Sequence, residues 1–172
     1  MASTTLGSAT DRVSSWRASF WAGIIAGAVF LVGEMALAPA VGASPWAPAR
    51  MIAAIVAGRG VLPPPATFHL GIVLLALVIH FILSVVYALL LSPLVAGVGR
   101  RAAAVVGTLY GLVLYLVNFY GFTALFPWFA MARNWVSVVM HLVFGAAAAY
   151  SYKVLARQVH DPVITSTVGR TA

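Results

Sequence analysis

The chain has 172 residues, of which 63% are hydrophobic and only 8% are charged, a composition outside the range of soluble globular proteins that indicates an integral membrane protein. The formal net charge of +7 does not indicate nucleic-acid binding, because the Lys and Arg residues lie at the ends of apolar runs, where they act as topology signals and as contacts with anionic lipid. Since the chain contains no cysteine, disulfides, thiolate metal sites and thiol catalysis are excluded.

Four apolar runs follow one another along the chain, and each is long enough to cross the hydrocarbon core of a bilayer as a helix. An isolated span must satisfy its own backbone hydrogen bonds, so all four runs are predicted to be α-helical. We therefore predict an all-α membrane protein, a four-transmembrane-helix up-down bundle that forms one domain over residues 16–158. The spans are placed at about 20–40, 69–91, 103–124 and 135–152.

The two ends of the chain, residues 1–15 and 159–172, are predicted to be disordered cytoplasmic tails. With the N-terminus inside, seven Lys and Arg residues lie on the cytoplasmic side and three lie outside. This bias predicts that both termini are cytoplasmic. The inner set is Arg12, Arg17, Arg100, Arg101, Lys153, Arg157 and Arg170, and the outer set is Arg50, Arg59 and Arg133.

The first run also has features of a cleavable signal peptide, namely a basic approach and small-residue triplets near its end. Its apolar stretch is too long for a typical signal peptide, and it carries one half of an internal pattern that recurs in a later span. We therefore predict that residues 20–40 form a transmembrane helix.

The first outer loop, at about residues 41–66, is predicted to contain a short interfacial helix. Ser44 and Pro45 form a typical helix start, residues 51–56 are apolar, and Gly58 can end the helix. Such a helix would lie on the outer leaflet, with Arg50 and Arg59 reaching lipid headgroups. It would serve either as a lid over the outer end of the bundle or as a simple connector.

Two of the spans share a pattern of small and polar residues. Gly23, Gly27 and Glu34 have the same spacing as Gly107, Gly111 and Asn118, and eleven residues of helix bring each triple onto one stripe. Small residues four apart allow helices to approach closely in lipid, so both stripes are predicted to face protein. The chain thus resembles two hairpins related by a parallel repeat.

The other two spans share a looser pattern, in which a histidine is followed four residues later by a small residue. His80 precedes Ser84, and His141 precedes Gly145. At 1.5 Å per residue, Glu34, Asn118 and His141 lie about 10 Å below the outer end of their spans, and the repeat places His80 near the same level. We predict a polar layer with Glu34 across from Asn118 and His80 across from His141.

Three interpretations of this layer remain open. It could be a structural cluster in which Glu34 hydrogen-bonds a histidine and Asn118 satisfies the remaining groups. It could be a proton or cation relay, because carboxylates and imidazoles within spans mark such pathways. It could also hold a cofactor, with His80 and His141 as axial ligands of a haem b or, together with Glu34, as ligands of a transition metal.

Of these interpretations, a small protein related to ion, proton or solute transport is preferred, with an accessory or structural subunit and a haem or metal protein as alternatives. The sequence predicts no bound cofactor. It contains no Ser/His/Asp constellation, paired carboxylates or metalloprotease motif, so we expect no enzyme activity. The expected partners are the lipid bilayer and a homo-oligomer or larger membrane complex, but not nucleic acid.

Three segments carry a resemblance to known proteins: WRASFWAG at 16–23, SPWAPARM at 44–51 and GVLPPPATF at 60–68. With these segments and its overall layout, the chain resembles a group of small, uncharacterised, four-span proteobacterial inner-membrane proteins, some of which carry a sodium/proline symporter label. The resemblance implies a bacterial inner membrane and no catalytic residues. The label implies no mechanism, because inverted-repeat symporters need far more spans and the repeat here is parallel.

Overall fold

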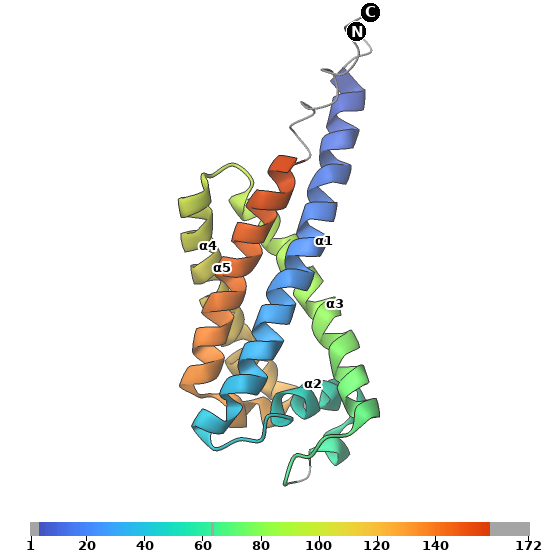
Figure 1. Cartoon of the computed structure of the whole chain (residues 1–172), viewed down its shortest axis with the longest axis vertical. Coiled ribbons are helices and arrows are strands. Elements are labelled where there is room, and N and C mark those ends of the chain that lie inside the picture. Colours follow the sequence, from blue (N-terminus) through green and yellow to red (C-terminus); the bar gives the residue numbers. More distant parts are fainter. Residues whose placement is uncertain (1–3, 63, 159–172) are drawn as a thin grey trace, which may run out of the picture.

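A computed structural model describes the backbone of residues 4–62 and 64–158 and the side chains of residues 16–62 and 64–156. Within these ranges every regular element is a helix (Figure 1). Four helical segments are long and apolar enough to cross a membrane, which confirms that the chain has the build of a multi-pass membrane protein. They are Trp16–Val41, Leu70–Val95, Arg100–Ala124 and Trp135–Ala156.

Helix α1 (Thr4–Leu37) is longer than predicted, and the short 3₁₀ helix η1 (Ala38–Val41) extends it at its far end. Gly42 then ends the segment with φ 72°. Residues 4–15 were expected to be part of a disordered tail, but their backbone is helical, since adding residues to an existing helix costs little once it is nucleated. The second expected tail, residues 159–172, lies outside the described residues.

Helix α2 (Ala47–Ala57) lies in the first long loop, close to where a short helix was predicted. Gly58 ends it as expected, with φ 76°, a backbone conformation that suits glycine. Its start was predicted incorrectly, because α2 begins after Trp46 rather than at the Ser44–Pro45 pair. The Ser44 hydroxyl instead accepts a hydrogen bond from Trp46 N and donates one to Ala66 O, so it ties the two ends of the loop together.

The prediction that Arg50 reaches lipid headgroups is also wrong. The Arg50 side chain is buried, and its guanidinium donates to Val61 O, Thr67 O and Thr67 Oγ1 at 2.9, 2.8 and 3.3 Å. These acceptors belong to the connection between α2 and α3, whose backbone carbonyls have no helical partner. Arg50 therefore fixes α2 to the connection that follows it.

Three longer segments complete the fold. Helix α3 (Leu70–Val95) starts at His69, whose ring nitrogen accepts from Ile72 N. Helix α4 (Arg100–Leu116) continues into a π-helical turn, η3 (Val117–Gly121), and a 3₁₀ turn, η4 (Phe122–Ala124). After the 3₁₀ helix η5 (Pro127–Ala132), α5 (Trp135–Gln158) returns along the molecule.

The helices pack unequally. The most extensive contacts are between α4 and α5 and between α1 and α5, followed by α1 with α3, whereas α3 and α4 touch only slightly. Helix α3 diverges from the others toward the end of the molecule where α2 lies, and α2 packs against α3 there (Figure 1). The divergence leaves room between α3 and the rest of the helices.

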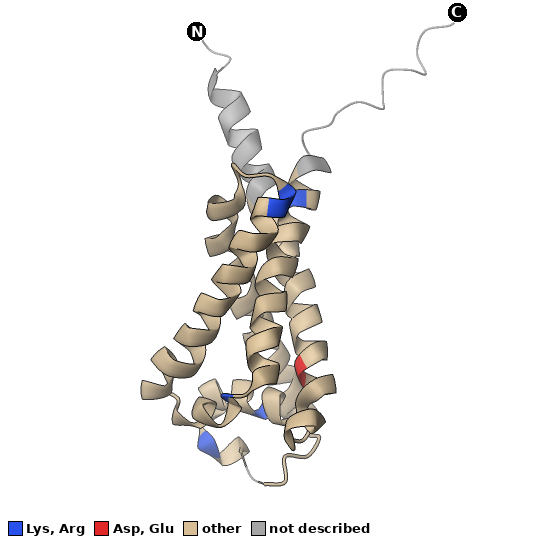
Figure 2. Ribbon diagram, turned by 90° about the vertical axis from the view of Figure 1, so that its left-hand side faces the viewer, with Lys and Arg blue, Asp and Glu red and all other residues tan. Residues whose placement is uncertain are grey.

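The charged residues lie mainly at the two ends of the molecule, and Glu34, the single acidic residue among those whose side chains are described, lies between these two groups (Figure 2). Lys153 donates to Val95 O and Ala96 O and so satisfies carbonyl groups at the C-terminal end of α3. Large apolar side chains are exposed along the outer faces of the four long helices, for example Val32, Val78 and Leu109. This distribution is the one expected of helices surrounded by lipid.

Candidate functional site: an intramembrane cavity

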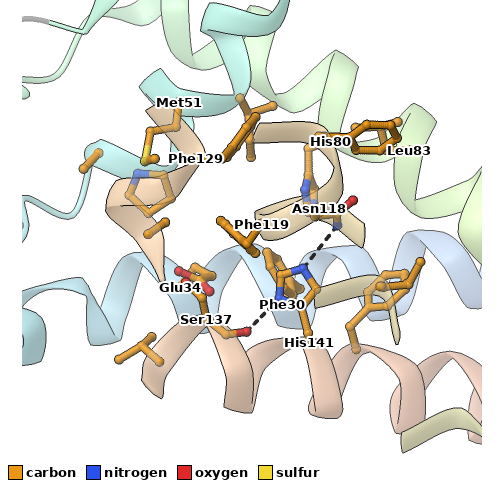
Figure 3. A pocket seen from close by; sticks show the side chains of 18 of the residues that line it. Phe30, Glu34, Met51, His80, Leu83, Asn118, Phe119, Phe129, Ser137 and His141 are labelled. Carbon is orange, nitrogen blue, oxygen red and sulfur yellow. Dashed lines mark hydrogen bonds between the residues drawn. The ribbon is translucent and has the colours of Figure 1, made fainter. Parts of the chain in front are cut away.

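A cavity of about 340 Å³ lies between the helices on the side of the molecule where α2 is found. Helices α1, α3 and α5 and the irregular end of α4 form its walls, and α2 and η5 cover it. All four residues of the predicted polar layer line it, namely Glu34, His80, Asn118 and His141 (Figure 3). The structure therefore brings together around one space the side chains that the two sequence patterns singled out.

Glu34 is buried, with 7% of its surface exposed, and it interacts with a polar residue that the sequence patterns did not identify. The Ser137 side chain of α5 lies close enough to the carboxyl group to interact with it. The carboxyl oxygen Oε1 is buried and has no hydrogen-bond partner among the described residues. The structure thus leaves one acceptor of Glu34 unsatisfied beside a cavity.

The expectation that Glu34 hydrogen-bonds a histidine is not met among the described residues, where the bonds of His80 and His141 go to other groups and the polar side chain beside Glu34 is Ser137. The reason is the position of α1, which packs closely on α5 and so brings Glu34 next to Ser137, one turn before His141. The spacing of Ser137 and His141 could have revealed this neighbour, because residues four apart lie on the same face of a helix.

His141 and Asn118 belong to a continuous hydrogen-bonded chain. His141 Nδ1 donates to Ser137 O at 2.7 Å, and Asn118 Nδ2 donates to His141 Nε2 at 3.3 Å. The Tyr87 hydroxyl in turn donates to Asn118 Oδ1 at 2.8 Å, and the Tyr110 hydroxyl donates to the backbone carbonyl oxygen of Tyr87. A neutral His141 protonated on Nδ1 satisfies every bond in this chain.

The π-helical turn brings Asn118 into this chain. Such turns widen a helix locally and often occur at functional sites. Arg133, from the connection to α5, supports the turn by donating to Phe119 O at 2.7 Å and to Thr123 Oγ1 at 3.1 Å, while its guanidinium lies 4.3 Å from the centre of the Tyr120 ring. No local sequence pattern indicated the π turn or this contact.

His80 lies apart from that chain. Its Nε2 donates to Gly27 O at 2.8 Å, and the Ser84 hydroxyl lies 3.4 Å from the same nitrogen. The ring of Phe30 connects the two histidines, since it stacks on His80 at a centroid distance of 5.7 Å and meets His141 edge-on at 4.9 Å. The polar groups therefore form separate clusters around an aromatic centre rather than one connected layer.

The glycines of the sequence pattern lie where helices cross. A Cβ built on Gly27 would lie 2.6 Å from Ser84 Oγ and 3.3 Å from His80 Nε2, and one built on Gly23 would lie 2.7 Å from Val85 Cα. In the second half of the chain, Gly111 and Gly107 pack against the backbone of His141 and Gly145. Each pair of glycines thus allows one helix to approach its histidine-bearing neighbour closely.

The cover of the cavity is tied down by side chains from both loops. Trp128 of η5 donates its indole N–H to Met51 O of α2 at 3.1 Å, and Arg50 fixes the far side of α2 as described above. Two of the residues that line the cavity, Phe122 and Met131, are also part of the molecular surface, with 41% and 72% of their surface exposed.

The positions and hydrogen bonds of the histidine and carboxyl groups determine how well the site could bind a metal ion or a haem. Among the described residues, no three His, Asp or Glu side chains lie close enough together to hold a metal ion. Both ring nitrogens of His141 and the Nε2 atom of His80 already take part in hydrogen bonds. Ligation through any of these nitrogens would require breaking the corresponding contact.

Comparison of the chain with protein-family models, with curated proteins and with solved structures found no match in any of the three.

Proposed function

We propose that this chain is a small integral membrane protein related to ion, proton or solute transport, in which the cavity is the binding site and Glu34 is the group that exchanges a proton or a cation. The observation that carries the proposal is the buried Oε1 atom of Glu34, which has no hydrogen-bond partner among the described residues. His80, Asn118 and His141 would form the remaining polar surface of the site.

An unsatisfied carboxyl oxygen argues against a purely structural role for Glu34. Buried polar groups are nearly always hydrogen-bonded, and leaving one without a partner costs roughly 1–3 kcal/mol. Asn118 and His141 follow this rule completely, since each of their side-chain polar atoms has a partner. Glu34 Oε1 departs from this rule, because this buried atom of a cavity-lining residue has no partner among the described residues.

The proposed setting is a bacterial inner membrane with both termini cytoplasmic. In this orientation α2, η5 and the cavity lie in the outer half of the bilayer, and α2 lies at the outer interface. The bias in Lys and Arg residues supports this orientation. The two hairpins, α1 with α3 and α4 with α5, would then be related by a parallel repeat. It is supported by the position of Gly27 against the side chain of His80 and of Gly111 against the backbone of His141.

A second candidate is an accessory subunit whose polar cluster is structural. The hydrogen-bonded chain from Tyr110 through Tyr87 and Asn118 to His141 supports it, because that chain is complete without a ligand. In this case the protein would act within a homo-oligomer or a larger membrane complex. Binding of a haem b or a transition metal has less support, because it would displace hydrogen bonds that the histidines already make.

Flux into proteoliposomes distinguishes these candidates. The full-length protein is reconstituted, and proton flux is followed with an internal pH-sensitive dye after an imposed pH or cation gradient. The proposal predicts flux that Glu34→Gln abolishes, although the variant keeps its helix content and its elution volume. Flux that Glu34→Gln leaves unchanged, or no flux from the wild-type protein with any tested monovalent or divalent cation, would contradict the transport role and favour the accessory role.

A further inference from the structure

The chemistry of the cavity also indicates a class of ligand. We propose that the cavity binds a small lipophilic amine in its ammonium form, with an N–H group of the ammonium donating to Oε1 of Glu34 and the apolar part of the molecule lying among the aromatic side chains. This inference rests on the proposed function, because it takes the cavity to be a ligand site.

The charges around the cavity favour a cation. Glu34 is the only Asp or Glu among the described residues that line it, and no Lys or Arg side chain belongs to that lining. The titratable side chains that share the space are Tyr87 and His80 on α3 and His141 on α5. The hydrogen bonds of His141 are satisfied by a neutral ring. An anionic ligand would thus meet a carboxyl group without a fixed positive charge to bind it.

In the ionised form of Glu34 the unsatisfied oxygen is an acceptor, so its partner must be a donor. Glu34 Oε1 is buried in the wall of the cavity, and an ionised carboxylate in such surroundings is stabilised when it is both paired with a cation and hydrogen-bonded. An ammonium group meets both needs through one charge-assisted hydrogen bond. A quaternary ammonium has no N–H group, so it could pair with the carboxylate charge but could not donate a hydrogen bond to it.

Most of the remaining lining is apolar and aromatic. Phe30, Phe119 and Phe129 contribute rings to the cavity, with Met51 above them, and Phe119 and Phe129 point into the same space as Glu34 (Figure 3). Aromatic rings attract cations through the negative charge of their faces, and they also bury an apolar body well. A bare or hydrated metal ion would gain little from such walls, because it requires several oxygen ligands.

The size of the cavity limits the ligand. Its volume of about 340 Å³ is at the lower end of the roughly 300–1,000 Å³ that small-molecule sites occupy. A compact amine with a cyclic hydrocarbon body suits this space. The ammonium could belong to a free amine or to the headgroup of an aminophospholipid whose chains remain in the bilayer, and the two sources share the same contact with Glu34.

Three compounds of nearly equal shape test the proposal: 1-adamantylamine, 1-adamantanol and adamantane-1-carboxylate. Binding is measured by isothermal titration calorimetry to the full-length protein in phosphatidylcholine nanodiscs, with empty nanodiscs as blank, because the phosphatidylcholine headgroup has no N–H donor. We expect the amine to bind at least about tenfold more tightly than the alcohol, the change expected from one charge-assisted hydrogen bond, and the carboxylate not to bind.

Variants of Glu34 separate charge from shape. Glu34→Gln should weaken amine binding at least about tenfold and leave alcohol binding unchanged, since the amide keeps the volume of the carboxyl group but lacks its charge. Glu34→Asp, which keeps the charge on a shorter side chain, should give an intermediate affinity. The exposed residue Tyr120, changed to Phe, serves as the control and should bind the amine as the wild type does.

Several results would overturn the inference. It fails if the amine and the alcohol bind equally, if the carboxylate binds best, or if Glu34→Gln binds the amine with wild-type affinity. It also fails if none of the three compounds binds, although Glu34-dependent flux in proteoliposomes would then still support the proposed function. When phosphatidylethanolamine is added to the nanodiscs, weaker amine binding would identify the lipid headgroup as an occupant, and unchanged binding would identify a free amine.

Discussion

The contact between Gly111 and the backbone of α5 gives the most specific prediction about stability. A Cβ built on Gly111 would clash with the backbone oxygen of His141. It would also lie 2.8 Å from the carbonyl carbon of His141 and 3.2 Å from Leu142 Cα. Ordinary carbon–carbon contacts lie at about 3.5–4.0 Å. Gly111→Ala must therefore move α4 away from α5 by close to 1 Å, because neither backbone can yield locally.

The cost of this movement follows from the packing. A radial gap of about 0.5–1 Å removes roughly a quarter to a half of the dispersion energy between facing atoms, and α4 with α5 is the most extensive helix contact in the molecule. We expect Gly111→Ala to lower the free energy of unfolding by about 2–3 kcal/mol, the upper part of the range for overpacked sites. It should also weaken the bond between Asn118 and His141, whose backbone is displaced.

The measurement is unfolding in mixed micelles with increasing mole fractions of sodium dodecyl sulfate, followed by circular dichroism. The matched control is Gly121→Ala, because a Cβ built on Gly121 meets nothing within 4 Å, and this variant should differ from the wild type by no more than about 0.5 kcal/mol. Equal stability of Gly111→Ala and Gly121→Ala would refute the claim that the glycine pattern serves close helix packing.

Three further predictions concern the walls and the cover of the cavity. Asn118→Ala removes the link between Tyr87 and His141 and should lower the free energy of unfolding by about 1–3 kcal/mol. Flux in proteoliposomes should be weakened but not abolished. Complete loss of flux in a folded variant would instead place Asn118 in the relay itself. Arg50→Met leaves three acceptors of the connection between α2 and α3 without their donor. Limited proteolysis should therefore cut that connection faster in Arg50→Met than in Arg59→Met, a control at an exposed residue. Equal rates of cleavage would show that Arg50 does not hold α2. Purified protein should lack a Soret band, and a reduced-minus-oxidised haem b spectrum that disappears in His80→Ala or His141→Ala would instead establish the cofactor alternative.

Hydropathy and local patterns accounted for much of the fold. The four spans could be predicted because a helix that crosses a bilayer needs a long, nearly uncharged run, and this signal is contained in each segment by itself. The glycine patterns indicated which faces pack, since helical periodicity places Gly23 with Gly27, and Gly107 with Gly111, on one stripe. The convergence of Glu34, Asn118 and His141 followed from their similar depth in the spans.

The remaining features depend on contacts between segments that are distant in sequence. Ser137 meets Glu34 because α1 packs on α5, and the burial of Arg50 depends on how the connection to α3 folds back over it. The π turn at Asn118 is held by Arg133 from the next connection. Single-helix periodicity contains no information on these pairings, so the separate polar clusters around Phe30 could not be distinguished from a single layer.

The central claim is that Glu34 faces a cavity that can be reached from the outer side of the membrane, and the lack of native cysteine allows this to be tested directly. Glu34→Cys and Val32→Cys are compared, because Val32 lies on the same helix about 3 Å away along its axis but is 68% exposed on the outer surface of the bundle, where lipid would surround it. A small, cationic, membrane-impermeant methanethiosulfonate reagent is added from outside, with Arg59→Cys as the positive control. We expect Glu34→Cys to be labelled and Val32→Cys to remain unlabelled. If Arg59→Cys reacts while Glu34→Cys remains unlabelled, or if Val32→Cys reacts as fast as Glu34→Cys, the cavity is not an outward-facing site.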